Sequence, residues 1–225
     1  MARVRWEKRF QYASRAERAK FIAEVYGEFL AGDVLDVGCS GAALREAVTG
    51  RYVGIDIAGQ PDLVVNLEKE RIPLPDDSFD CVVCSDVLEH LDNLHQTFDE
   101  LVRVSRRYVL ISLPNCFNYE NVFRIWTGRR LKFYGLPASP DEDRHKWFFG
   151  HHEAEEFFRA NATRHGLGVV GLNSLPLRYR GLKGGLLLAL VRVLSITPRR
   201  FAELGTLATW VVLEKKPRAA GTLNA

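Results

Sequence analysis

The stretch from Asp33 to Leu44, Asp-Val-Leu-Asp-Val-Gly-Cys-Ser-Gly-Ala-Ala-Leu, constrains the fold of this 225-residue chain more than any other. Val34, Leu35 and Val37 form an apolar run interrupted by Asp36, which is typical of a strand buried on both faces of a parallel sheet. Gly38 and Gly41 can adopt positive φ and leave room for a ligand beside the backbone where the strand turns into a helix. The stretch therefore predicts a strand, a tight turn and a helix. This turn either binds a nucleotide or is a simple connection that binds no ligand.

Four further stretches predict strands that also end in polar residues. Residues 51–56, Arg-Tyr-Val-Gly-Ile-Asp, place an acid about 20 positions after Asp36, where a carboxylate can accept both ribose hydroxyls of an adenosine group. The other three stretches are residues 62–66, 79–86 and 108–114. Strands that alternate with helices indicate right-handed crossovers and a doubly wound α/β fold, whose ligands bind at the carboxyl ends of the parallel strands. The polar residues expected there are Asp36, Asp56, Asn66, Asp86 and Asn115.

The most telling segment runs from Asn66 to Leu91. It begins with Asn66, a polar residue placed to contact an adenine. A Leu-Pro-turn-Phe-Asp sequence then leads into the fourth strand, and Leu88-Glu-His-Leu91 follows that strand. In these features the chain resembles the class I S-adenosylmethionine-dependent methyltransferases, in particular the type 11-like branch that acts on small molecules, lipids and sugars. The resemblance covers roughly residues 34–115, with a weaker similarity to Lys216. It implies a Rossmann-like, seven-stranded, mostly parallel sheet with helices on both faces and an antiparallel last strand.

The resemblance also implies the cofactor, S-adenosyl-L-methionine, which leaves as S-adenosyl-L-homocysteine. Asp36 would orient the amino acid end of the cofactor through the loop amides, and Asp56 would hold the ribose. The full set implied is Asp36, Gly38, Cys39, Ser40, Gly41, Asp56, Ile57, Asn66, Leu67 and Ser85. The family usually has Gly-x-Gly-x-Gly in the loop, whereas Ser40 and Ala42 replace two of the glycines here. Because both are small, we expect weakened rather than abolished cofactor binding.

Histidines are the candidates for proton removal, because imidazole titrates closest to neutral pH. His90 lies one helical turn after Asp86, and Glu89 can share that face. The pattern is similar to that of metal-assisted O-methyltransferases of the ubiquinone and small-RNA types, in which a later histidine helps to hold a divalent ion over the accepting hydroxyl. We therefore predict that His90, His145 and Glu89 are catalytic. A divalent metal is possible but is not the favoured interpretation, since the same motif also occurs in methyltransferases that use none.

The remaining residues are expected to complete one domain spanning residues 1–216. Helices in 1–32 would pack on a sheet edge or cover the cofactor. Residues 114–146 are rich in aromatic and basic side chains and too long for an idle connection, so we expect a cap over the substrate. Further helices are predicted at 87–104, at 153–165 with His151 and His152 as its solvated start, and at 186–196. Further strands are predicted at 167–172 and 207–213, followed by a flexible tail at 217–225.

Composition and charge restrict the partners and the cellular location that we expect for this protein. A net charge of +3 does not indicate a nucleic-acid partner. The apolar run at 186–196 is too short to span a bilayer and is interrupted by Arg192, although the basic residues around it leave peripheral membrane contact through 178–200 as an alternative. The four cysteines lack the spacing of a zinc ribbon and are interpreted as reduced core residues of a cytoplasmic protein; they are Cys39, Cys81, Cys84 and Cys116.

The sequence thus predicts a methyltransferase that acts on oxygen, or as a second choice nitrogen, of a small molecule, a sugar or a lipid-linked glycan. One alternative is an NAD(P)-dependent Rossmann oxidoreductase, which should instead show Gly-x-Gly-x-x-Gly. A second is a catalytically inactive binding module with the same fold, for which Ser40 and Ala42 are the only support.

Overall fold

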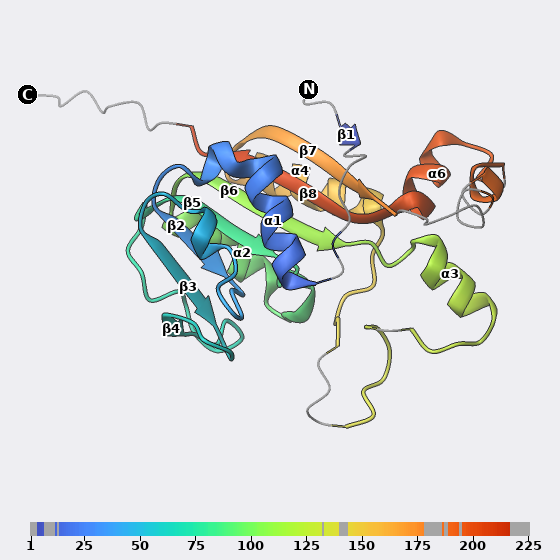
Figure 1. Ribbon diagram of the computed structural model, residues 1–225, viewed down its shortest axis with the longest axis horizontal. Helices are drawn as coiled ribbons and strands as arrows, with labels where there is room; N and C mark the ends of the chain where they lie inside the picture. The colour runs from blue at the N-terminus through green and yellow to red at the C-terminus, as the bar shows by residue number, and fades with distance from the viewer. Residues whose placement is uncertain are drawn as a thin grey trace, which may run out of the picture.

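The fold is built on a sheet whose central strands are apolar and buried. The structure is a computed structural model that describes residues 4–6, 12, 14–131, 133–139, 144–177, 186, 189–193 and 195–216. Eight strands lie in the order β1-β7-β8-β6-β5-β2-β3-β4 (Figure 1). They are β1 (Val4–Trp6), β2 (Val34–Val37), β3 (Tyr52–Asp56), β4 (Leu63–Val64), β5 (Phe79–Ser85), β6 (Ser105–Pro114), β7 (Gly168–Pro176) and β8 (Thr206–Glu214).

The predicted sheet is confirmed, with one strand added. Seven strands, from β4 at one edge to β7, form the expected mostly parallel arrangement. The last strand, β8, runs antiparallel to both β6 and β7. The eighth strand, β1, pairs parallel with β7. Residues 1–32 were expected to be helical, so this strand is a correction. Its physical reason is that β7 would otherwise leave a row of backbone groups unpaired along the sheet edge.

Helices cover both faces of the sheet (Figure 1). The helices are α1 (Arg15–Tyr26), α2 (Leu94–Val104), α3 (Tyr119–Trp126), α4 (His151–Arg164) and α6 (Pro198–Gly205), with short 3-10 helices η1 (Gly27–Leu30), η2 (Arg45–Ala47) and η3 (Leu88–His90). The alternating side chains of β5 divide between two cores: Cys81 and Val83 pack with α1, whereas Val82 and Cys84 pack with α2 and α4. The two cysteines therefore lie on opposite faces. All four cysteines are buried and unpaired, as expected.

Helix α1 packs on a face of the sheet rather than on its edge. It begins after Ser14, whose hydroxyl accepts a hydrogen bond from the Glu17 N–H (3.2 Å). The rings of Phe21 and Tyr26 lie 5.2 and 5.5 Å from the Trp210 ring of β8, which is fully buried. Phe10, which was expected to share this apolar face, lies outside the described residues.

Two predicted helices are shorter than expected. The helix after β2 is only the 3-10 turn η2, and the helix predicted at 87–104 is broken into η3 and α2. At the break, the Leu91 carbonyl accepts a hydrogen bond from the Trp147 indole (2.7 Å), and the Asp92 N–H donates to the Glu68 carboxylate (3.0 Å). Backbone groups that a continuous helix would pair internally are thus satisfied by distant side chains.

The bounds of several later elements differ from the predicted bounds by a few residues. Helix α4 begins at His151 rather than Glu153, β7 extends to Pro176, and β6 begins at Ser105. Leu186 and residues 189–193 are helical, as the predicted crossover helix requires. Among the described residues, no helix has the length and apolar character needed to cross a bilayer. The expected tail at 217–225 lies outside the described part of the chain.

Truncating Trp210 to Ala should destabilise the protein by about 3–5 kcal/mol, because it leaves a cavity where the ring packs between α1 and β8. Urea unfolding followed by far-UV circular dichroism measures this cost. Trp126→Ala is the matched control, since this tryptophan is 81% exposed and its loss should change stability by less than about 0.5 kcal/mol. Equal costs for the two variants would contradict the packing described here.

Candidate active site

Three neighbouring parallel strands bring the predicted cofactor residues together. Val37 of β2 pairs with Ile55 of β3 and with Cys84 of β5. The next residue along each strand is Gly38, Asp56 or Ser85, so these three lie side by side at one end of the sheet. Of the polar residues expected at the strand ends, Asp56 therefore lies beside the glycine loop, and its contact with a cofactor stays a prediction.

The loop after β2 has the left-handed backbone that glycine favours. Gly38 has φ +77°, and a Cβ built there would lie 2.3 Å from a Val87 methyl group, so only glycine fits. Ser40 and Ala42, the two replacements for family glycines, also have positive φ, at 50° and 53°. A side chain in this region costs about 1 kcal/mol or more. Both residues therefore keep the loop conformation at some cost in strain.

The Asp56 carboxylate holds this loop in place. Its Oδ2 accepts the Ser40 N–H at 2.7 Å, and its Oδ1 accepts the Ile57 N–H at 2.7 Å. Oδ1 also accepts the Ala58 N–H at 3.3 Å. A carboxylate oxygen can accept about two hydrogen bonds, so the remaining capacity for a ribose hydroxyl is on Oδ2. The predicted ribose contact stays a prediction, and loop bracing is a role that sequence reasoning missed. Ile57 is exposed beside it.

Asp36 and Cys39 lie beneath the loop. Asp36 is buried and accepts a hydrogen bond from the Tyr52 hydroxyl (2.7 Å). Burial raises the pKa of the Asp36 carboxyl to about 6, although the Tyr52 hydroxyl and the Arg18 charge act to lower it. Burial, with the nearby Asp36 charge, also raises the pKa of the Cys39 thiol to about 12. Cys39 is buried, and its sulfur lies against Gly54 of β3, where an added Cβ would come within 2.7 Å of it.

Two arginines of α1 reach into the site. The Arg15 guanidinium donates to the Ser40 hydroxyl, and Arg18 forms an ion pair with Asp86. Asp86 also accepts a hydrogen bond from the Ser112 hydroxyl (2.6 Å). Sequence reasoning expected a helix over the cofactor but named neither arginine. The available signal was their spacing of three residues, which puts both on one helical face.

The remaining cofactor residues surround the same strand ends. The Ser85 hydroxyl is buried and has no hydrogen-bond partner among the described residues, which fits a position facing a ligand. Asn66 braces its own turn, since its Oδ1 accepts the Glu68 N–H (3.1 Å). The Leu67 carbonyl accepts a hydrogen bond from the Asn93 amide (2.7 Å).

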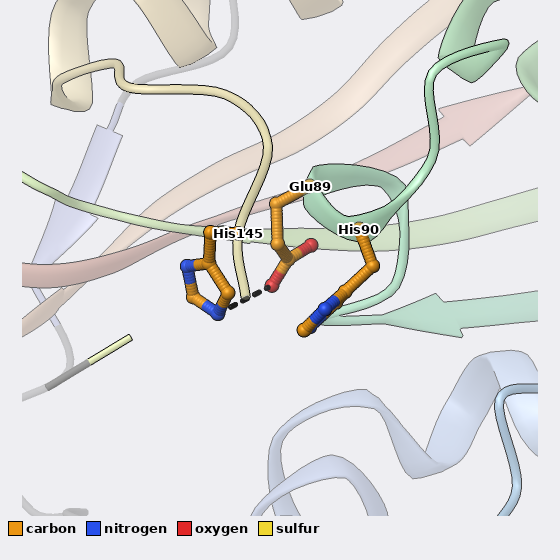
Figure 2. A group of neighbouring side chains, drawn as sticks. All are labelled: Glu89, His90 and His145. Carbon is orange, nitrogen blue, oxygen red and sulfur yellow. Dashed lines mark ion pairs between the residues drawn. The ribbon is translucent and has the colours of Figure 1, made fainter. Parts of the chain in front are cut away.

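Beyond β5, the structure gathers the three predicted catalytic residues (Figure 2). The Glu89 carboxylate is buried, and one of its oxygens lies 4.0 Å from His145 Nε2. The His90 and His145 rings are 4.7 Å apart, and one ligand atom from each of the three residues lies within 4.8 Å of the other two. The backbone fixes the cluster, because the Lys146 N–H donates to the Glu89 carbonyl (2.8 Å).

This cluster can act chemically in two ways. Two imidazoles beside a carboxylate can accept and hold a proton. One carboxylate oxygen with two imidazole nitrogens is also a donor set that suits divalent transition metals. The ring of Phe133 stacks on His145 at 5.4 Å and Tyr134 meets it edge-on at 4.7 Å, so part of the expected cap does reach the site.

A cavity of about 240 Å³ opens beside Glu89. Its wall is formed mainly by apolar side chains of η3, α2, β6 and α4 and of the segment before α4. These are Leu88, Leu94, Leu113, Trp147, Phe149, Ala154 and Phe157, joined by Glu89, His95 and Glu153. Sequence reasoning missed this cavity, because its wall comes from segments far apart in the chain.

His151 differs from the expected solvated helix start. It is buried, its Nδ1 lies 2.7 Å from the Thr209 hydroxyl, and burial lowers its pKa to about 4. Its backbone N–H donates to the Glu203 carboxylate (2.6 Å), so α6 caps α4. Asn115, expected near the ligand, instead donates to the Thr206 carbonyl (2.8 Å) and anchors the end of α6.

Residues 35–111 match a family described as a methyltransferase domain. This match covers the glycine loop, Asp56 and the Glu89–His90 motif, so it coincides with the site described above. Residues 35–111 are thus similar to a methyltransferase domain, which agrees with the resemblance to S-adenosylmethionine-dependent methyltransferases noted in the sequence. The sequence matches none of the curated proteins.

Solved structures agree with this methyltransferase fold. A SAM-dependent methyltransferase from Archaeoglobus fulgidus is similar at 16% identity and a TM-score of 0.57, over 90% of this chain and 95% of that one. The small RNA methyltransferase HEN1 is similar at 14% and 0.59, over 93% of this chain and 27% of that one. Magnesium protoporphyrin IX methyltransferase from Synechocystis PCC 6803, with bound SAH, is similar at 14% and 0.51, over 89% and 83%. At these identities the similarities show the fold.

Replacing Ala42 with Gly should stabilise the methyltransferase by about 0.5–1 kcal/mol, because it removes left-handed strain. Ser40→Gly should tighten S-adenosylhomocysteine binding or leave it unchanged, although it removes the Arg15 contact. Urea unfolding and calorimetric titration measure these effects. Ala31→Gly is the control, because Ala31 has φ −71° and glycine there should destabilise. Destabilisation by Ala42→Gly of the same size as by Ala31→Gly would argue against a strained loop.

Proposed function

We propose that this methyltransferase transfers the methyl group of S-adenosylmethionine to an oxygen, or as a second choice a nitrogen, of a small molecule, a sugar or a lipid-linked glycan. The observation that carries the proposal is the convergence of Glu89, His90 and His145 just beyond β5, at the end of the sheet where the glycine loop lies. A proton acceptor is therefore available where the methyl group would be presented.

The cofactor would lie across the ends of β2, β3 and β5. In this proposal Asp36 receives the ammonium group of its amino acid end, Asp56 the ribose, and Asn66 with the Leu67 backbone the adenine. Ser85 lines the methionine side. Arg18 is already paired with Asp86 at the same edge and is suited to the cofactor carboxylate.

Methyl transfer is an in-line displacement at the methyl carbon. A C–O bond forms as the S–CH₃ bond breaks, the sulfonium becomes the neutral thioether of S-adenosylhomocysteine, and the acceptor proton passes to an imidazole of His90 or His145. Glu89 faces His145 and stabilises the imidazolium that results. The apolar cavity beside Glu89 provides space for a non-reacting part of the acceptor and excludes water.

The same three residues could hold a divalent ion. Such an ion would supply Lewis acidity that lowers the pKa of the acceptor hydroxyl. The protein's own part would be unchanged, because Glu89, His90 and His145 would orient the acceptor at the same position.

The alternatives from the sequence are less well supported. The methyltransferase-domain match over 35–111 favours this cofactor over NAD(P). Ser40 and Ala42 retain positive φ, so they give no argument that the loop has lost its binding conformation.

Cofactor affinity should depend on pH through Asp36. Its pKa, raised to about 6 from 3.8, means that the carboxylate is charged only above that pH. S-adenosylhomocysteine should therefore bind more weakly as the pH falls below about 6, by up to tenfold for each unit. Calorimetric titration between pH 5 and 7.5 measures this, with circular dichroism to verify folding. Asp36→Asn should weaken binding and flatten the profile. An unchanged profile in that variant would remove Asp36 from the site.

Loss of the catalytic cluster should separate binding from turnover. His145→Ala and Glu89→Gln should reduce methyl transfer at least 100-fold while changing S-adenosylhomocysteine affinity less than threefold. Transfer is measured as S-adenosylhomocysteine release with panels of hydroxylated small molecules, sugars and lipid extracts, with and without a chelator and added Mn²⁺ or Mg²⁺. His152→Ala is the control, because His152 lies outside the cluster. Full activity of His145→Ala on an acceptor used by wild type would refute this role.

A further inference from the structure

Helix α3 and the residues after it expose an unusual amount of apolar surface. No residue of α3 is buried. Trp126 is 81% exposed and Leu136 is 88% exposed, and Phe123 and Ile125 are half-exposed. Single exposed apolar side chains are ordinary, but a cluster of large ones marks a surface that binds something.

A second exposed apolar segment lies next to α3. Helices α3 and α6 are in contact and lie side by side beyond the end of the sheet (Figure 1). The residues before α6 join them, because the Arg192 guanidinium lies 5.8 Å from the Phe201 ring. In that segment Leu190, Val193 and Ile196 are exposed. We call the described residues of 119–136 and 186–204 the α3–α6 surface.

The charge of the α3–α6 surface is strongly positive. Its described basic residues are Arg124, Arg129, Arg130, Arg192, Arg199 and Arg200, against the acids Glu120 and Glu203. Six positive and two negative charges give +4, which exceeds the +3 of the whole chain. Glu203 is turned inward, since it accepts the backbone N–H groups of His151 and His152. All six arginines are exposed, and Glu120 is the one exposed acid among the described residues of the surface.

The combination of charge and apolar side chains indicates the occupant. Arginines can bind lipid phosphates, while tryptophan and aliphatic side chains enter the boundary between headgroups and acyl chains. An acidic protein or a nucleic acid would bind the arginines but would not need large, highly exposed apolar side chains such as Trp126 and Leu136. We propose that the α3–α6 surface docks this methyltransferase on an anionic lipid bilayer.

The α3–α6 surface is rigidly connected to the candidate active site. Asn115, directly after β6, donates to the Glu203 and Thr206 carbonyls and so fixes α6 to the strand end (2.5 and 2.8 Å). Three residues later, Asn118 caps α3 by accepting the Asn121 N–H (3.1 Å). Residues 133–134, which continue from α3, contact His145.

Docking would therefore present the site to molecules held in the bilayer. This step rests on the proposed function and narrows its acceptor to an amphiphile whose accepting hydroxyl lies at the lipid surface. Part of the region suggested by the sequence for membrane contact, 178–185, lies outside the described residues, and so does Lys132. Neither is used in the argument.

Co-sedimentation with lipid vesicles tests the docking without cofactor or acceptor. Vesicles of phosphatidylcholine with phosphatidylglycerol should bind the protein at low salt, at least tenfold more strongly than phosphatidylcholine alone, and less at high salt. Trp126→Ser with Leu136→Ser, and separately Arg124→Glu with Arg129→Glu, should each reduce partitioning at least tenfold. The matched controls are Val64→Ser, at an exposed residue of β4, and Arg159→Glu, at an exposed residue of α4; both should bind like wild type.

Two results would overturn the docking proposal: no preference of wild type for anionic vesicles, or equal losses in the variants and their controls. The first would leave a protein partner as the occupant. Calorimetry with S-adenosylhomocysteine keeps this test separate from the proposed function. Vesicle binding without cofactor binding would refute only the proposed function, and cofactor binding without vesicle binding would refute only the docking.

Discussion

One carboxylate holds the cofactor end of the sheet together. Asp56 accepts backbone N–H groups from Ser40 on the neighbouring loop and from Ile57 in its own turn. Hydrogen bonds to a charged acceptor are stronger than neutral ones, and here they offset the strain of positive φ at Ser40 and Ala42. The positions of Gly38 and of the Arg15 contact both depend on that loop.

Charge around the site comes from a small number of buried and half-buried groups. Asp36, Asp86 and Glu89 lie at the ends of β2 and β5, and Arg18 is the cation paired with Asp86. In the proposed reaction the incoming cofactor carries a sulfonium charge that the departing product lacks. In the proposed site, an excess of carboxylates would therefore attract the substrate form of the cofactor more than the product form.

The sequence predicted those parts of the fold and site that depend on local pattern. Polar residues in or after apolar runs located Asp36, Asp56 and Asp86 at or next to the ends of β2, β3 and β5. The Leu-Glu-His-Leu motif located Glu89 and His90. The missed features depend on contacts between distant segments. The break before α2 requires Trp147 and Glu68, the cavity requires walls from several segments, and strand β1 requires the edge of β7. No local periodicity carries that information.

Strand β1 also affects how molecules of this protein meet one another. In the described sheet the outermost strands are β1 and β4, with three and two residues, whereas β7 with nine residues lies one position inside. Long open edges are templates on which a second chain can add a strand, and very short ones are poor templates. Residues 4–6 pair with Leu172, Asn173 and Ser174 in the middle of β7 and so interrupt its open edge. A chain shortened by its first few residues would present β7 as one long edge and would be more prone to associate through it.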